Sequence, residues 1–213
     1  MEKDKLHEAL KILYSTYPNL HHYLHFRNPL ELLVATILSA QVRDEMVNAA
    51  TPALFKNYTT AQDYVNADSN ELFGFVKNIN LAGNKVKYIQ EACRLIATRH
   101  DGEVPRTMAE LVDLPGIGRK TANVILQNAF GIVEGVVVDT HVLRVSYRLG
   151  ITTTNKNAKR AENDLMNVLP KCEWRTFPHL MKNHGRAVCK APTPLCCSCV
   201  VKKLCIQQGV NFK

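Results

Sequence analysis

Five of the seven cysteines fall within a short segment near the C-terminus, and their spacing is typical of a metal site. Four follow the pattern Cys189-x6-Cys196-x2-Cys199-x5-Cys205, and the fifth is Cys197. The chain opens without the features of a secretory signal, which disfavours disulfides and leaves metal or cluster ligation as the leading interpretation. Four thiolates can hold a zinc ion or a 4Fe-4S cluster. Structural zinc sites usually combine two short Cys pairs and only one is present here, so the spacing favours iron–sulfur.

The other cysteines are expected to have different roles. Cys197 adjoins a proposed ligand and could compete for the same metal position, so its contribution stays open. Cys93 and Cys172 are isolated on stretches of helical pattern, where a thiol usually packs as a small apolar group. We therefore expect both of these side chains to lie in the core. Free buried thiols are the alternative for the C-terminal cysteines as well.

A second pattern with chemical potential is Leu-Pro-Gly-Ile-Gly-Arg-Lys-Thr-Ala at residues 114–122. Gly116 and Gly118 permit positive φ and leave no Cβ in the way of a close neighbour. If the following helix begins near Gly118, its unpaired N–H groups and positive dipole end suit a phosphate, and Arg119 adds positive charge. An ordinary helix–helix connector is the alternative, and the basic continuation favours phosphate binding.

Lys120 occupies the first turn of this expected helix, where a cation is electrostatically unfavourable. The helix end and partial burial both disfavour the ammonium form, which makes a neutral, nucleophilic amine more available. From its position alone, a surface lysine that binds phosphate is the better supported alternative. Asp139 precedes another helical pattern and is expected to cap it. The same carboxylate can also face a cleft and stabilise a developing cation.

The elements that position these residues are expected to be helices. Residues 28–31 (Asn-Pro-Leu-Glu) and 107–110 (Thr-Met-Ala-Glu) are typical of helix N-termini. Apolar residues at helical spacing run from 122 to 129, and Gly131 stands where a left-handed stop is expected. Another helix should run from after Asp139 to Gly150. Residues 136–138 (Val-Val-Val) show no alternation and fit a buried connector, so we expect a mostly α chain.

The composition is typical of one or two folded domains, and the charge distribution indicates binding to a polyanion. The 213 residues are 46% hydrophobic and 22% charged, so general disorder is excluded. The apolar run of residues 32–38 is too short for a membrane helix, and we expect no membrane association and a cytoplasmic location. Residues 171–213 hold eight Lys or Arg and a single acid, which indicates a nucleic-acid partner or a solvated basic tail.

In combination, the three patterns resemble the endonuclease III family of DNA glycosylases. They are the segment at 114–122, the Val-Asp-Thr-His segment whose Asp139 follows Lys120 by nineteen residues, and the four-cysteine pattern. Similarity extends over nearly the whole chain, through Leu-Ser-Ala-Gln at 38–41 and His-Gly-Arg at 184–186.

The resemblance implies an all-α fold of the helix-hairpin-helix DNA glycosylase type, with two helical domains flanking an active-site cleft. Residues 22–132 would form a six-helix domain that carries the helix-hairpin-helix at about 107–130. Residues 1–21 and 133–213 would form an iron–sulfur domain with its cluster loop at 189–205. Cys189, Cys196, Cys199 and Cys205 would hold a 4Fe-4S cluster.

The resemblance also implies the activity, which is that of a bifunctional DNA glycosylase and abasic-site lyase of base excision repair. Its substrate would be double-stranded DNA with oxidised pyrimidines or abasic sites. Lys120 would attack C1′ of the flipped nucleotide, expel the base and cut the strand on the 3′ side by β-elimination. Asp139 would be the essential carboxylate, either stabilising charge or moving protons.

DNA contacts are implied for several further residues. Gln41 and Leu81 would fill the gap left by the flipped base, although the loop after Leu81 matches the family less closely. The backbone at Gly116 and Gly118, with Arg119, would contact phosphate. The six residues after Cys189 include one base, Lys190, where related enzymes often have more, and Arg186 would compensate. The protein would act as a monomer, associated with the nucleoid of a prokaryote.

Two other functions stay open at this stage. One is a monofunctional, adenine-excising relative, which Lys120 and the length of the chain disfavour. The other is a non-catalytic module that uses the hairpin and the cluster only to bind DNA or transfer electrons.

Overall fold

The computed structural model describes residues 2–20 and 22–210, which form two compact units. One unit comprises residues 22–132, and the other combines residues 1–21 with residues 133–213. Each unit has its own apolar core. Helices are the only regular elements in the described ranges, so the expectation of an all-α chain is confirmed.

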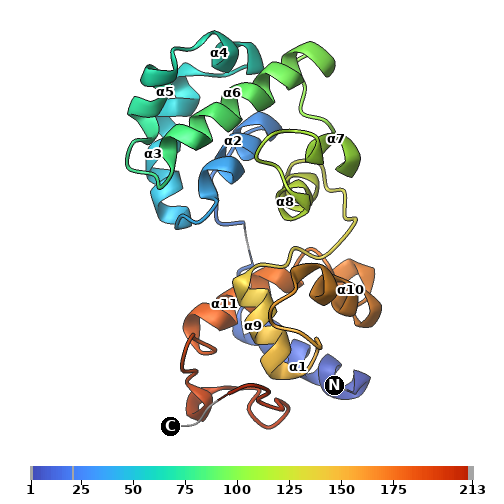
Figure 1. Cartoon of the computed structure of the whole chain (residues 1–213). Coiled ribbons are helices and arrows are strands. Elements are labelled where there is room, and N and C mark those ends of the chain that lie inside the picture. Colours follow the sequence, from blue (N-terminus) through green and yellow to red (C-terminus); the bar gives the residue numbers. More distant parts are fainter. Residues whose placement is uncertain (1, 21, 211–213) are drawn as a thin grey trace. The chain divides into compact units, whose positions relative to one another are not determined.

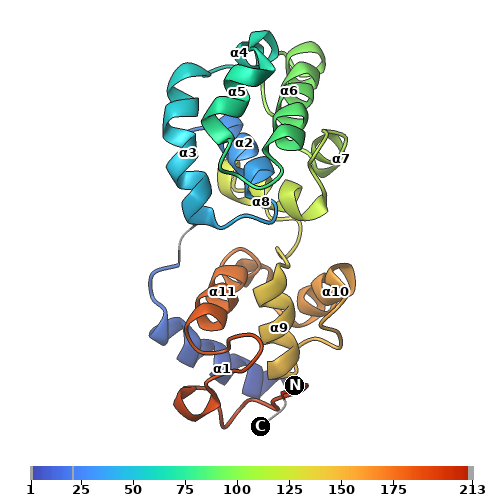
Figure 2. The same cartoon turned by 60° about the vertical axis from the view of Figure 1, so that its left-hand side comes forward.

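The unit of residues 22–132 is built around a central apolar helix. Its helices are α2 (Pro29–Ser39), α3 (Asp44–Asn57), α4 (Ala61–Asn66), α5 (Ser69–Val76), α6 (Ala82–Arg99), α7 (Met108–Val112) and α8 (Arg119–Ala129). Every side chain from Leu32 to Leu38 is buried, and α2 contacts α3, α6 and α8 (Figures 1 and 2). A helix that is apolar on all sides is stable only when neighbours surround it, as they do here.

Within its described residues this unit has seven helices, whereas the resemblance implied six. Within residues 61–76, two polar side chains each begin a short helix. Thr60 forms a reciprocal capping box with Asp63 at the start of α4. Asp68 then accepts a hydrogen bond from the backbone N–H of Asn70 and begins α5. Each cap therefore starts a separate helix.

The expected helix ends of this unit are confirmed. The Asn28 side chain accepts a hydrogen bond from the Glu31 N–H at 2.9 Å, ahead of Pro29 in the first turn of α2. The Thr107 hydroxyl accepts from the Glu110 N–H at 3.3 Å and starts α7. Gly131 has φ +69° directly after α8, as expected for a left-handed stop.

The second unit brings the N-terminal helix together with the C-terminal third of the chain. Its helices are α1 (Lys3–Thr16), α9 (Thr140–Leu149), α10 (Ala158–Val168) and α11 (Phe177–Ala187), with 3-10 turns η1 (Lys171–Glu173) and η2 (Cys196–Ser198). Both α1 and α9 contact α11 (Figure 2). The apolar core of this unit includes fully buried side chains from all four helices, such as Leu13, Val142, Leu165 and Phe177.

The residues 133–139 that lead into α9 form no strand. Val136 and Val138 are buried, so this segment is the buried connector expected from its composition. Gly150 ends α9 with φ +81°, again as expected. In the described part of the chain, no helix is both long and apolar enough to cross a membrane.

Candidate functional site

The turn between α7 and α8 requires a glycine at its centre for two reasons. Gly116 has φ +80°, a region that side chains with a Cβ rarely occupy. A Cβ placed there would also lie 3.1 Å from the Cβ of Tyr88. On either side of Gly116, Leu114 and Ile117 are buried, and the Ile117 N–H donates to the Leu114 carbonyl at 3.1 Å. The turn is therefore anchored in the core by Leu114 and Ile117, while Gly116 itself is exposed.

The N-terminus of α8 is open and positively charged. Gly118 is the N-cap residue and has no side chain that could cap the helix. A Cβ at Gly118 would meet no atom within 4 Å, so the backbone there can be approached closely. The first turn contains no acidic residue, and its first two residues are the exposed Arg119 and Lys120. This combination of donors and charge suits a bound anion such as a phosphate.

Lys120 is the second residue of α8, as the sequence predicts, but it is exposed. The expected partial burial of Lys120 is therefore wrong. The reason is the helical register, because α8 turns Ala122, Ile125 and Leu126 toward the core and leaves Lys120 on another face. The expectation that Lys120 lies in the first turn of α8, at the positive end of the helix dipole, is met.

Asp139 caps α9, as expected. It is half-buried, and its Oδ1 accepts a hydrogen bond from the Val142 N–H at 2.8 Å. Burial lowers the pKa of nearby His141, although the negative charge of Asp139 opposes that shift. The neutral ring can accept a hydrogen bond from Arg144, whose Nη2 lies 3.1 Å from His141 Nδ1. The cap thus fixes a carboxylate beside a neutral imidazole and a guanidinium.

Gln41 and Leu81 share an unusual backbone conformation. Their φ angles are +57° and +59°, in the left-handed region that a non-glycine residue enters at a cost of about 1–2 kcal/mol. The Leu81 side chain is 56% exposed, although it is apolar. Strain and exposure of this kind are common at functional sites.

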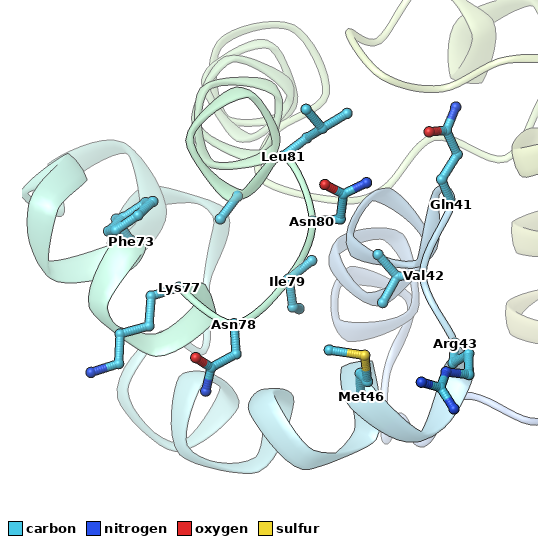
Figure 3. A pocket seen from close by; sticks show the side chains of 11 residues that line it. Gln41, Val42, Arg43, Met46, Phe73, Lys77, Asn78, Ile79, Asn80 and Leu81 are labelled. Carbon is cyan, nitrogen blue, oxygen red and sulfur yellow. The ribbon is translucent and has the colours of Figure 1, made fainter.

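The two residues line the same pocket, which has a volume of about 540 Å³ (Figure 3). In that view Asn80 lies between Leu81 and Gln41. No sequence pattern predicts the other lining residues, because they come from separate segments that only the fold brings together. They are Val42, Arg43, Met46, Phe73, Lys77, Asn78, Ile79, Asn80 and Ala82.

The four cysteines of the C-terminal pattern line one common pocket, namely Cys189, Cys196, Cys199 and Cys205. Cys197 is exposed and is not among the residues that line it. Over residues 2–20 and 22–210, no group of three or more His, Cys, Asp or Glu side chains has the arrangement of a single-ion site.

The two isolated cysteines differ from each other. Cys93 is fully buried in α6, as expected, and burial raises the pKa of its thiol to about 12. The expected burial of Cys172 is wrong, because this residue is exposed. It lies in the 3-10 turn η1 and not in a long helix, so the apolar periodicity that suggested a core position does not apply there.

Polar groups surround the sulfur atoms of the cysteine pocket. The guanidinium of buried Arg148 lies 3.6 Å from Cys189 Sγ and donates to two carbonyls of the 189–205 segment, those of Lys190 (2.7 Å) and Pro192 (2.9 Å). The Gln207 N–H donates to Cys205 Sγ at 3.4 Å. Arg148 therefore holds the segment around the cysteines in place.

His184 reaches the pocket from α11. Burial lowers its pKa to about 4, so the ring is neutral at pH 7. The Tyr17 hydroxyl lies 3.1 Å from Nδ1, and donation to that nitrogen leaves a proton on Nε2, 3.6 Å from Cys199 Sγ. Burial raises the pKa of Cys205 to about 11, so a bound cation is needed to favour its thiolate. Four thiols with donors beside three of them fit a thiolate-held metal cluster.

The predicted basic contacts lie on the surface of the same unit. Arg186, near the end of α11, and Lys190, directly after Cys189, are both exposed. The backbone at Lys190 is fixed by its bond from Arg148, so its side chain projects from an ordered segment.

Comparison with known proteins gives one consistent result. Residues 34–171 match the family described as HhH-GPD superfamily base excision DNA repair protein. The chain is 48% identical over 204 residues to endonuclease III of Synechocystis sp., which covers 96% of this chain and 93% of the relative. It is 46% identical over 178 residues to endonuclease III of Bacillus subtilis, covering 84% and 81% of the two chains.

The fold has a close match among solved structures. The structure of a trapped covalent intermediate of endonuclease III and DNA, in an estranged-adenine complex, superposes with a TM-score of 0.91. The two sequences are 42% identical, and the match covers 97% of each chain.

Proposed function

Because the chain belongs to the HhH-GPD superfamily of base excision DNA repair proteins, we propose that it is a bifunctional DNA glycosylase and abasic-site lyase of the endonuclease III type. The observation that carries this proposal is the placement of Lys120. It follows a Gly-Ile-Gly turn at the uncapped N-terminus of α8, in a chain 42% identical to a protein trapped as a covalent DNA intermediate. The substrate would be double-stranded DNA that contains oxidised pyrimidines or abasic sites.

Lys120 is proposed as the nucleophile in both steps. The neutral amine attacks C1′ of a nucleotide flipped out of the duplex, so that a C–N bond forms while the glycosidic bond breaks and the base leaves with its electron pair. Opening of the sugar ring gives an iminium between Lys120 and C1′. The iminium acidifies the C2′ proton, and its removal expels the 3′ phosphate by β-elimination. The exposed side chain at the start of α8 supports this role, because no packing has to be broken to reach a substrate.

Asp139 is proposed as the carboxylate that assists base removal. Its cap bond through Oδ1 holds the carboxylate in one orientation, and orientation is what a charge-stabilising or proton-transferring group requires. The neutral His141 and the Arg144 guanidinium define its polar surroundings.

DNA binding is proposed to rest on two features of the unit of residues 22–132. The N–H groups of the turn at Gly116 and Gly118, together with Arg119, would hold a phosphate, in keeping with the open helix end. Gln41 and Leu81 would fill the space that a flipped nucleotide leaves in the duplex. Their strained backbones and outward position on one pocket support that role.

Cys189, Cys196, Cys199 and Cys205 are proposed to hold a 4Fe-4S cluster. Their common pocket and the donors from Arg148, His184 and the Gln207 N–H support this assignment. The bound group would supply the cross-link that orders residues 189–205. That segment presents Lys190, and the neighbouring α11 presents Arg186, to the DNA backbone. The protein is proposed to act as a monomer at the nucleoid.

A borohydride trapping assay tests the proposed function. The protein is incubated with duplexes that each carry one lesion, namely an oxidised pyrimidine, an abasic site or adenine opposite 8-oxoguanine, with and without borohydride. We expect a covalent complex and strand cleavage with the first two substrates. Adenine release without trapping would instead indicate a monofunctional enzyme. Binding without base release or cleavage on any duplex would indicate a non-catalytic module.

A further inference from the structure

A buried lysine is hydrogen-bonded to the backbone at both of the residues proposed to enter the DNA duplex or directly beside them. Lys85, in the first turn of α6, is only 4% exposed, and desolvation lowers the pKa of its ammonium group. Sequence analysis did not identify it, although a signal was present. Lys85 falls at helical spacing with Ala82, Ile89 and other buried residues of α6, so it lies on the apolar face.

The Lys85 ammonium group holds the C-terminal end of α2. Its Nζ donates to the carbonyl of Leu38 at 2.8 Å and to that of Ala40 at 2.7 Å. The last carbonyls of a helix lack partners within the helix, and a cation is favourable at that end of the dipole. The Lys85 ammonium group therefore satisfies carbonyls at the end of α2, a task that a glycine C-cap motif performs in many other helices.

These two bonds fix the residue that follows. The Ala40 carbonyl belongs to the peptide that joins Ala40 to Gln41, so Lys85 anchors that peptide directly. Gln41 has φ +57°, which costs free energy unless its surroundings impose it. The Val42 N–H closes the turn by donating to the Ser39 carbonyl at 3.0 Å.

The same lysine is bonded to the second residue through its backbone. The Lys85 N–H donates to the carbonyl of Leu81 at 3.1 Å, which forms the first turn of α6. Leu81 is the N-cap of that helix, with φ +59° and no side-chain cap. One residue thus contacts the Gln41 turn with its side chain and the Leu81 carbonyl with its main chain.

We propose that Lys85 is a positioning residue that couples the Gln41 turn to the Leu81 turn and holds both side chains in the geometry needed to enter the duplex. This inference rests on the proposed function, because it assigns a purpose to the positions of Gln41 and Leu81. It requires no contact between Lys85 and DNA, since the ammonium is covered by the protein.

The first test measures the coupling without any enzymatic assay. Lys85→Met keeps a similar side-chain volume but removes the charge and the donors. Hydrogen exchange followed by mass spectrometry should show faster exchange in peptides that cover residues 39–43, with the rest of the unit unchanged. Lys87→Met, an exposed lysine on the same helix, is the matched control and should leave that exchange unchanged. Unchanged protection of residues 39–43 in Lys85→Met would overturn the proposal.

The second test separates positioning from a general loss of structure. A single-stranded abasic substrate has no stack to open, so it does not need Gln41 or Leu81. Lys85→Met should lose roughly tenfold in single-turnover cleavage of a lesion duplex, the order expected for lost charged hydrogen bonds, and much less on the single strand. Lys85→Arg, which keeps the charge and donors, should recover part of the duplex activity. Equal losses on both substrates would reduce Lys85 to a structural residue and overturn the proposal.

A double-mutant cycle identifies the residue through which Lys85 acts. In a Gln41→Ala or Leu81→Ala background, Lys85→Met should cost less on the duplex than it does in the wild type. Full additivity in both backgrounds would contradict the coupling. If Lys85→Met does not unfold cooperatively, the same comparisons are made with Lys85→Gln, which is shorter and neutral but retains a polar donor. An inactive wild type would refute the proposed function, whereas the exchange measurement would still test the coupling.

Discussion

At the residue scale, the structure separates groups that resemble one another in sequence. Lys120 and Lys85 both lie in the first turn of a helix, yet Lys120 is exposed and Lys85 is buried against two carbonyls. The ammonium group of Lys85 donates hydrogen bonds to two backbone carbonyls, those of Leu38 and Ala40. Lys120 is therefore the candidate nucleophile of the two, and its role can be tested by substitution.

Lys120→Gln should abolish strand cleavage and borohydride trapping on an oxidised-pyrimidine duplex, because an amide cannot form an iminium. Folding and lesion binding should stay largely intact, since the exposed side chain contributes little to the core. Lys159→Gln is the matched control, because Lys159 is exposed and occupies the same second position in α10. Peptide mapping of the wild-type adduct checks the assignment, and an adduct on Lys87 or on the N-terminal amine would contradict it.

Asp139→Asn should slow base removal by roughly 10²-fold or more, the order seen when an acid–base or charge-stabilising group is lost. Stability should fall little, because an asparagine oxygen can still accept the Val142 N–H. Single-turnover kinetics and urea unfolding measure the two effects separately. Asp68→Asn, the same change at the N-cap of α5, should alter neither the rate of base removal nor the stability strongly. A variant that melts earlier but reacts normally would leave Asp139 only as a cap.

At the scale of elements, the two glycines of the helix-hairpin-helix turn differ in whether the fold requires them. Gly116 is needed by the turn, because of both its positive φ and the neighbouring Tyr88. Gly118 has an ordinary φ of −94° and open space around it, so its lack of a side chain is not required by the fold. The two glycines should therefore respond differently to the same substitution.

Gly118→Ala should weaken binding to damaged and undamaged duplex alike, because a methyl group would obstruct the approach of a phosphate to the backbone. The free energy of unfolding should change by less than about 1 kcal/mol. Fluorescence anisotropy at matched salt and urea unfolding measure the two quantities. Binding as tight as that of the wild type would show that this turn is only a connector.

Gly116→Ala should weaken binding and also reduce stability by about 1 kcal/mol or more, because it combines an unfavourable φ with a tight contact. Gly102→Ala provides the control for the backbone effect, since Gly102 has the same φ of +80° but no atom within 4 Å of its Cβ position. That control should lose stability without losing DNA affinity. Fluorescence anisotropy and urea unfolding again measure affinity and stability. A Gly116→Ala protein as stable as the wild type would contradict the argument from its φ and its contact with Tyr88.

At the scale of the whole molecule, the segment of residues 189–205 carries all four cysteines of the pocket. Residues 189–205 contain only the short turn η2 as regular structure, and the bonds from Arg148 tie the segment to α9. The backbone hydrogen bonds within this segment span short turns, and most of its side chains are exposed or half-buried. A bound cluster would therefore contribute to its order.

The purified protein should be yellow-brown and contain about four irons per chain, as expected for a 4Fe-4S cluster held by four cysteines. Cys199→Ser should lose the iron and become more sensitive to proteolysis within residues 189–205. Cys197→Ser is the neighbouring control and should keep the iron, because Cys197 is exposed and does not line the pocket. Elemental analysis and limited proteolysis measure both outcomes, and stoichiometric zinc in anaerobic preparations would overturn the assignment.

Local sequence patterns were enough to predict the helical fold class, the caps at Asn28, Thr107 and Asp139, and the glycine stops after α8 and α9. These features depend on a few neighbouring residues, since a cap or a left-handed stop is decided within one helical turn. The family resemblance rested on the order of Lys120, Asp139 and the four cysteines along the chain, and it supplied their expected roles. Local patterns and ordered motifs of this kind can be read without knowing which segments meet.

Tertiary structure decided the burial of individual side chains and the grouping of distant segments. Periodicity did not foresee that Lys120 is exposed or that Cys172 lies outside the core, because burial depends on which neighbour covers a face. The pocket that is lined by both Gln41 and Leu81, and the bonds from Lys85 to the end of α2, link residues 40 to 47 positions apart. Such contacts exist only after α6 packs on α2, because a side chain can hold a distant carbonyl only when the fold places the two within hydrogen-bonding distance.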